Sequence, residues 1–230
     1  MPNKYPAIGR SEVVVHTPRH VRSFADLGDE ELELVAQAWR ARAGAARAEG
    51  FAYVQALVNE GRDAGASLAH THSQLVWLEE EPPVPRRERK QLLVGDCAFC
   101  SLLEQEREDT KRVVVERDGL LLVCPYASRL PFELLVAPAA HEPEAFGSRH
   151  LAGALVLVAE GLRRLFAVES PRPFNAWLHT APFGEDGHWH LEVLPRLSLL
   201  AGLELGAGIY VNAVPPEEAA AALREAVVAA

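Results

Sequence analysis

The chain has 230 residues, of which 49% are hydrophobic and 24% are charged, as in ordinary globular proteins. Its net charge of −9 disfavours a nucleic-acid partner, because binding DNA or RNA usually needs a basic surface. No apolar run reaches the roughly 18 residues of a membrane span, and the first ten residues do not form a signal peptide. We therefore expect a cytoplasmic protein that does not associate with membranes.

The first third of the chain predicts strands alternating with a helix. Residues 12–17 are rich in β-branched side chains and predict a strand, and residues 29–42 predict a helix with acidic residues in its first turn. Two further strands are expected at 51–60 and 70–78, and the glycine-bearing segment 61–67 predicts a loop between them.

The remaining chain repeats this order after a stretch rich in proline and charge, 79–90, which predicts a linker. Apolar residues at helical spacing between Leu151 and Leu165 predict a helix, and another helix is expected just after Pro215. Strands are expected at 112–119, 120–127, 131–140, 174–182 and 188–197.

The two halves of the sequence are copies of one repeated unit. EVVVHTPRH, ending at His20, matches ELLVAPAAH, ending at His141, and AHTHSQLVWL matches GHWHLEVLPRL. The separation is 50 residues from His20 to His70 and 47 residues from His141 to His188. We therefore predict an α+β fold of two tandem units that form an antiparallel sheet with helices packed on one face.

These copies set the predicted domain organisation. The first unit, 1–80, lacks its front part and carries the strand with His70 and His72, and a linker occupies 81–92. The second unit covers 93–200, and a C-terminal segment with a helix covers 201–230.

Alternation along a strand places His70, His72 and Gln74 on one face, and likewise His188, His190 and Glu192. Burying two imidazoles and an amide is costly unless hydrogen bonds or a metal compensate. The segment His70-Thr71-His72-Ser73-Gln74 follows Asn59-Glu60-Gly61 and Gly65-Ala66-Ser67, and Asn3-Lys4-Tyr5-Pro6-Ala7 stands at the start. Together these motifs resemble galactose-1-phosphate uridylyltransferases, which belong to the histidine-triad superfamily.

The resemblance implies a nucleotidyltransferase that moves UMP between a UDP-sugar and a hexose 1-phosphate. His72 would attack the α-phosphorus and carry the uridylyl group covalently, and Gln74 would hold a phosphate oxygen. The resemblance also implies substrate contacts from Asn3, Asn59, Gly65, Ser67 and Glu204 and a homodimer.

A zinc site is predicted in the second unit. Cys97-x-x-Cys100 alone is moderate evidence, since such a pair can also be redox-active or simply buried. With His141 and His188 it makes a Cys2His2 set that suits tetrahedral zinc. By the repeat, His20 and His70 are the corresponding ligands of the first unit, but no cysteine pair precedes His20. Either the chain is N-terminally shortened, which we favour, or the first zinc is lost.

Three other functions are compatible with the sequence. One is an ADP-glucose phosphorylase or a dinucleoside-polyphosphate phosphorylase-like adenylyltransferase, which the lysine at position 4 leaves open. A second is a nucleotide hydrolase. The third is a zinc-stabilised binding module without turnover, in which His72 would be an ordinary core histidine.

Overall fold

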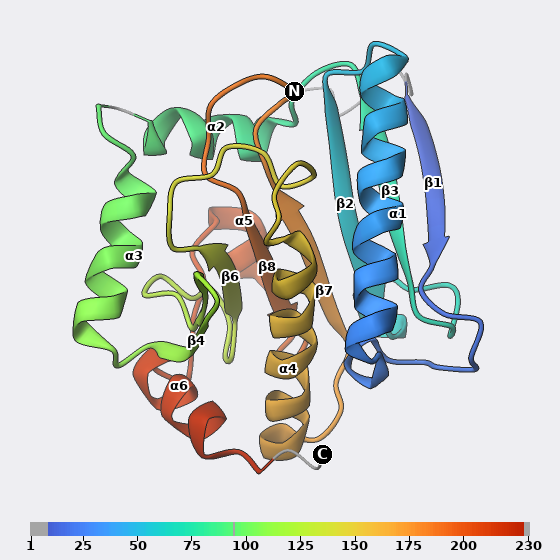
Figure 1. The fold of residues 1–230 in the computed structure, drawn as a ribbon. Helices are drawn as coiled ribbons and strands as arrows, with labels where there is room; N and C mark the ends of the chain where they lie inside the picture. The colour runs from blue at the N-terminus through green and yellow to red at the C-terminus, as the bar shows by residue number, and fades with distance from the viewer. Residues whose placement is uncertain (1–8, 94, 228–230) are drawn as a thin grey trace.

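A computed structural model describes residues 9–93 and 95–227. Eight strands form one sheet in the order β1-β3-β2-β7-β8-β6-β5-β4, and each neighbouring pair is antiparallel (Figure 1). The strands are β1 (Arg10–Val15), β2 (Tyr53–Glu60), β3 (His72–Leu78), β4 (Val113–Arg117), β5 (Leu120–Val123), β6 (Leu134–Pro138), β7 (Phe174–His179) and β8 (His190–Pro195).

Helices cover most of this sheet. They are α1 (Asp29–Ala48), α2 (Pro83–Leu92), α3 (Ala98–Asp109), α4 (Leu151–Glu169), α5 (Gly202–Ala207) and α6 (Pro216–Glu225), with 3-10 turns η1 (Phe24–Asp26) and η2 (Arg62–Ala64). Among the described residues, no helix is long and apolar enough to cross a membrane.

The internal repeat is visible in the topology. The series β1, α1, β2, β3 corresponds to β6, α4, β7, β8, and the strand order β1-β3-β2 is mirrored by β7-β8-β6 across the sheet. Strands β2 and β7 pair with each other and join the two halves into one continuous sheet. The predicted α+β class with an antiparallel sheet is therefore confirmed.

The main core lies between the sheet and helices α1 and α4, which run side by side over one face (Figure 1). Trp39 of α1 is fully buried there, and its Nε1 donates a hydrogen bond of 2.8 Å to Ser73 Oγ on β3. Because β3 alternates, burying Ser73 on the helical face turns its neighbours His72 and Gln74 toward the other face.

The prediction of helices on a single face is wrong for the second half. Leu120 and Leu122 of β5 pack into the main core, whereas Leu121 and Val123 belong to a separate cluster on the opposite face. Phe99 of α3, with its neighbour Leu103, covers that cluster. The four consecutive buried residues of β5 are the sign of a strand covered on both faces.

The expected linker at 81–92 is mostly helical, because α2 occupies Pro83–Leu92. Its prolines at 83 and 85 lie in the first turn, where the missing N–H groups leave no helical hydrogen bond unmade. Arg89 of α2 forms a 2.8 Å ion pair with Glu81, whose side chain is buried.

Candidate functional site

His72 is the first residue of β3 and is buried, with 6% of its surface exposed. Its Nδ1 lies 2.8 Å from the carbonyl oxygen of His70. A carbonyl oxygen can only accept a hydrogen bond, so Nδ1 carries a proton, and the neutral form of the ring has its lone pair on Nε2. Among residues 9–93 and 95–227, Nε2 has no hydrogen-bond partner. The ring is therefore held in the tautomer that a nucleophile needs.

A cavity of about 470 Å³ adjoins this histidine. Asn59 and Ser67, two of the predicted substrate contacts, line it together with His72. The intervening loop turns sharply, with Ala66 N donating to Gly61 O at 3.1 Å. Gly61 has a φ of +82°, and a Cβ atom there would lie 2.8 Å from side-chain atoms of Pro173, so the position requires glycine.

A second cavity of about 600 Å³ lies on the open face of the sheet, and Gln74 lines it. Asn59 borders both cavities and therefore connects the surroundings of His72 and Gln74. The side-chain oxygen of Asn59 accepts a 2.7 Å hydrogen bond from Asn175 Nδ2, which also donates to Ala64 O at 2.8 Å. Arg196 Nε in turn donates to Asn175 Oδ1 at 2.7 Å. Neither Asn175 nor Arg196 belongs to a local motif that would mark it in the sequence as part of this site.

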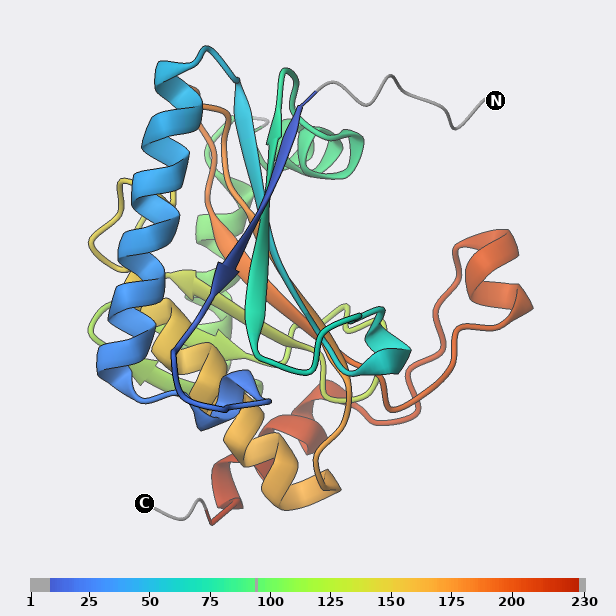
Figure 2. The ribbon, with the colours of Figure 1, turned by 90° about the vertical axis from the view of Figure 1, so that its right-hand side faces the viewer.

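Three predicted substrate contacts are not in this group. Asn3 lies outside the described residues. Gly65 ends η2 in a left-handed conformation, with φ +87°, and lines neither cavity. Glu204 lies on α5, which projects from the open face of the sheet (Figure 2), and its carboxylate accepts a hydrogen bond from Ala201 N at 2.9 Å.

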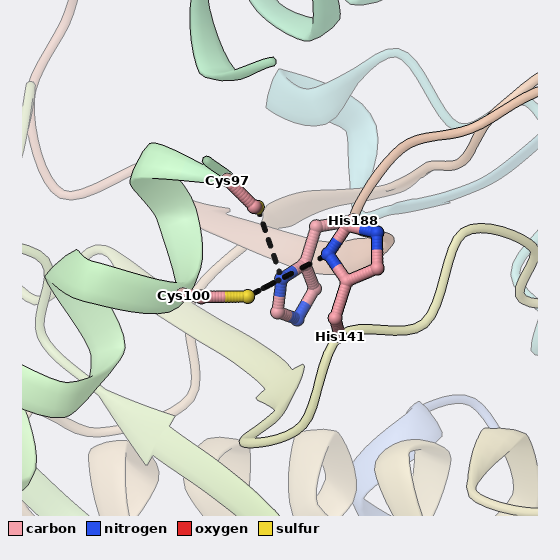
Figure 3. A group of neighbouring side chains, drawn as sticks. All are labelled: Cys97, Cys100, His141 and His188. Atoms are coloured by element: carbon pink, nitrogen blue, oxygen red, sulfur yellow. Dashed lines mark hydrogen bonds between the residues drawn. The ribbon is translucent and has the colours of Figure 1, made fainter. Parts of the chain in front are cut away.

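Cys97, Cys100, His141 and His188 converge, with one ligand atom from each within 4.8 Å of the others (Figure 3). The thiols come from the start of α3, and the imidazoles follow β6 and precede β8. His188 Nδ1 lies 3.3 Å from Cys100 Sγ and 3.7 Å from Cys97 Sγ, and His141 Nδ1 lies 3.5 Å from Cys100 Sγ. Sulfur and nitrogen ligands of one tetrahedral zinc ion lie about 3.6 Å apart, so the arrangement fits zinc.

The Nε2 atoms of His188 and His141, which point away from the thiols, also have hydrogen-bond partners. His188 Nε2 donates to Pro138 O at 2.9 Å, and His141 Nε2 contacts Asp186 Oδ1 at 2.9 Å. Burial lowers the pKa of His188 to about 4, so its Nδ1 lone pair stays free near neutral pH. Such outer partners orient metal-binding histidines.

The first unit keeps half of this arrangement. His70 Nε2 donates to Thr17 O at 2.8 Å, as His188 does to Pro138, and its Nδ1 has no hydrogen-bond partner among the described residues. The His20 and His70 rings have centroids 5.9 Å apart, a separation at which both imidazoles can bind one metal ion. No third histidine, cysteine or acidic ligand joins them within the part of the chain that the structure describes.

Comparisons with known proteins agree with this geometry. The family model "Galactose-1-phosphate uridyl transferase, N-terminal domain" matches residues 3–83. The galactose-1-phosphate uridylyltransferase of Streptomyces lividans is 30% identical over 97% of this chain and 72% of its own length. The chain belongs to the galactose-1-phosphate uridylyltransferase family.

Two further similarities describe the range of this family. An ADP-glucose phosphorylase of Arabidopsis thaliana is 29% identical over 94% of this chain, which spans 64% of that enzyme's length. A solved uridylyltransferase structure superimposes with a TM-score of 0.87 at 28% identity, over 94% of this chain and 74% of its own. The chain thus spans only part of these uridylyltransferase-family proteins.

The second unit of this uridylyltransferase-family chain differs at the position that corresponds to His72. His190 Nδ1 contacts His188 O, but its Nε2 lies 3.1 Å from Glu88 Oε1 and 3.4 Å from Glu192 Oε1. Burial opposes the charged form, yet the two carboxylates raise the pKa of His190 to about 10. Arg129 pairs with Glu192 in turn. His190 therefore has no lone pair to offer at neutral pH.

Proposed function

We propose that this chain transfers a nucleotidyl group through a covalent intermediate on His72, moving UMP between a UDP-sugar and a hexose 1-phosphate. The observation that carries the proposal is the hydrogen bond from His72 Nδ1 to His70 O, because it fixes the Nδ1–H tautomer and makes Nε2 the nitrogen that can attack from beside the cavity. In the second unit, carboxylates bind the equivalent nitrogen of His190, so we infer one reactive histidine per chain.

In the first half-reaction, the lone pair of His72 Nε2 forms a bond to the α-phosphorus of the nucleotide sugar. The bond from that phosphorus to the bridging oxygen breaks, and its electron pair leaves with the sugar 1-phosphate. The proton on Nδ1 stays in its hydrogen bond to His70 O and disperses the positive charge of the ring. The second half-reaction reverses these steps with another sugar 1-phosphate.

The neighbouring amides suit the charge that develops on the phosphate oxygens. Asn59 Oδ1 is occupied as an acceptor by Asn175, so its Nδ2 is the group available to donate toward a cavity. Gln74 supplies a second amide and Ser67 a hydroxyl. Neutral donors of this kind stabilise a phosphorane-like transition state when they are fixed beforehand.

A phosphorylase acting on ADP-glucose is a second candidate. The similarity to the Arabidopsis ADP-glucose phosphorylase is of the same order as that to the Streptomyces uridylyltransferase. Both candidates use the same histidine, and they differ in the base and in the phosphate that accepts the nucleotide.

Intact-mass measurement after incubation with UDP-glucose or ADP-glucose tests the proposal. We expect a mass gain of one nucleotidyl group with one of the two donors and no gain in His72→Asn. His190→Asn changes the equivalent residue of the second unit and should keep the gain. A folded wild-type protein that stays unmodified with both donors would refute the covalent mechanism.

We further propose that zinc binds the Cys2His2 group of the unit at 93–200, beyond the connecting segment 81–92. When bound, zinc would fix α3 to the segments after β6 and before β8 and take no part in the transfer. For the unit at 1–80 we propose His20 and His70 as ligands that need donors from outside the described residues.

We also propose a homodimer formed by residues 198–213, which we call the arm. The arm includes α5 and projects from the open face of the sheet (Figure 2). Its apolar side chains are exposed, including Leu199 at 88% and Leu205 at 74%. A free monomer rarely exposes such a patch, so a second copy is the expected partner, and Glu204 would then serve that copy's site. Sedimentation equilibrium should give a dimer for the wild type and a monomer for Leu199→Asp with Leu205→Asp.

A further inference from the structure

The cavity beside His72 gathers unpaired arginines. Most arginines of this chain hydrogen-bond or form ion pairs, as Arg42 does with Glu12 and Arg112 with Glu106. In five, the guanidinium group has no hydrogen bond or ion pair to any of the described residues. They are Arg22, Arg47, Arg62, Arg87 and Arg172, and three of them, Arg22, Arg62 and Arg172, line this one cavity.

These three arginines come from three separate segments. Arg22 precedes η1, Arg62 opens η2, and Arg172 precedes β7. All three side chains are exposed, whereas His72, which lines the same cavity, is buried. The cavity therefore has a cationic rim and an imidazole at depth, in a chain whose net charge is −9.

Within residues 9–93 and 95–227, Glu60 is the single acidic residue that lines the same cavity. One oxygen of its carboxylate accepts a 2.7 Å hydrogen bond from Phe24 N, so Glu60 is bound to the backbone and not to an arginine. Burial raises the pKa of Glu60 to about 7, which leaves much of it uncharged at neutral pH. The positive charge of the rim is thus largely uncompensated.

We propose that Arg22, Arg62 and Arg172 bind the phosphate dianion that exchanges with the nucleotide carried by His72. Guanidinium groups recognise phosphate through paired N–H donors, and the donors of these three make no other hydrogen bond to the described residues. The cavity of about 470 Å³ can hold a phosphate-bearing molecule of moderate size. This inference rests on the proposed function, because it concerns the second substrate of the same site.

The chemistry follows from this placement. An oxygen of the bound phosphate attacks the phosphorus of the histidine adduct, the nitrogen–phosphorus bond breaks, and its electron pair returns to His72 Nε2. Inorganic phosphate and a sugar 1-phosphate present the same dianion to the arginines. Water has no dianion for the arginines to bind, so the rim would favour a phosphate compound over water as the acceptor of the nucleotide. The rim does not decide which phosphate compound is used.

The test separates phosphate binding from adduct formation. Wild type, Arg62→Gln, Arg172→Gln and Arg22→Gln are loaded with nucleotide to completion at saturating donor, as judged by intact mass, and freed of donor by gel filtration. Loss of the adduct is then followed against the concentration of inorganic phosphate, against that of glucose 1-phosphate, and in buffer alone. Arg87→Gln is the matched control, because Arg87 is an exposed and unpaired arginine outside the cavity.

We expect each cavity variant to need at least tenfold more phosphate compound for half-maximal discharge, with unchanged discharge in buffer alone and in Arg87→Gln. The better of the two compounds identifies the source of the dianion. Cavity variants that discharge at the wild-type phosphate concentration would overturn the inference while the adduct itself still supports the proposed function.

Calorimetry with pyrophosphate on unmodified protein gives a readout independent of the adduct. Binding should be present in the wild type and in Arg87→Gln and at least tenfold weaker in Arg62→Gln and Arg172→Gln. If the wild type forms no adduct, the proposed function fails, and this titration still decides the arginine site. Equal affinity in all variants, or no binding to the wild type, would refute the site.

Discussion

Replacing Glu60 by glutamine should change how the stability of the protein depends on pH. Glu60 ends β2 on the cavity wall, and its carboxylate accepts the hydrogen bond from Phe24 N. Burial raises its pKa from 4.5 to about 7, so the folded state prefers the protonated carboxyl. A folded pKa above the unfolded one gives stability that is fully present below pH 4.5 and is lost as the pH rises through 7.

The size of the effect follows from this shift. A rise in pKa of that extent corresponds to about 3 kcal/mol of stability, which is lost mostly between pH 4.5 and pH 7. Glutamine keeps an oxygen for Phe24 N and carries no charge at any pH. We therefore expect Glu60→Gln to match the wild type within about 1 kcal/mol at pH 5 and to be more stable by about 3 kcal/mol at pH 8.5.

Urea unfolding at constant zinc, followed by circular dichroism from pH 5 to pH 8.5, measures this difference. Other titrating groups are common to both proteins and cancel when the two unfolding free energies are subtracted. Glu79→Gln, at an exposed position, is the control and should show no such trend. A difference between Glu60→Gln and wild type that stays constant over the pH range would refute a raised pKa for Glu60.

Three other substitutions test separate parts of the structure. Cys100→Ser should abolish stoichiometric zinc, as measured by inductively coupled plasma mass spectrometry, and lower Tm by roughly 10 °C, since metal binding contributes to folding; full zinc retention would contradict the site. Asn175→Ala removes the donor to Asn59 Oδ1 and should slow formation of the His72 adduct at least tenfold, and an unchanged rate would show that Asn59 needs no such support. Trp39→Phe leaves Ser73 Oγ without its donor and should lower the free energy of unfolding in urea by about 1–3 kcal/mol. A negligible change would show that this hydrogen bond contributes nothing to stability.

The fold was largely predictable because strand patterns and the repeat are local in sequence. Periodicity placed β2, α4 and β7 close to their observed bounds, and the repeat anticipated that His70 and His188 would occupy equivalent places. The structure adds that Thr17 O and Pro138 O accept equivalent hydrogen bonds from these two rings. Helix α2 was missed because its prolines look like a linker, although proline is also compatible with a first helical turn.

The residues of the candidate site could be predicted only where they belong to a short sequence motif. His72, Asn59 and Ser67 belong to one short segment and were selected together. The pairing of β2 with β7 brings Asn175 against Asn59 and Arg172 to the cavity beside His72, which no sequence spacing reveals. Whether an exposed arginine is paired also depends on tertiary neighbours, so the cationic rim emerges only from the structure.

The pairing of β2 with β7 has a consequence for dissecting the molecule. Leu57 pairs with Trp177 and Asn59 pairs with Asn175 between these two strands. If the chain is cut near α2, the first fragment keeps β2 without β7 and the second keeps β7 without β2. Each would then present a bare strand edge rich in apolar residues, a surface prone to aggregation. The fragments should be insoluble when expressed singly and should reassemble when produced together, as a split protein does.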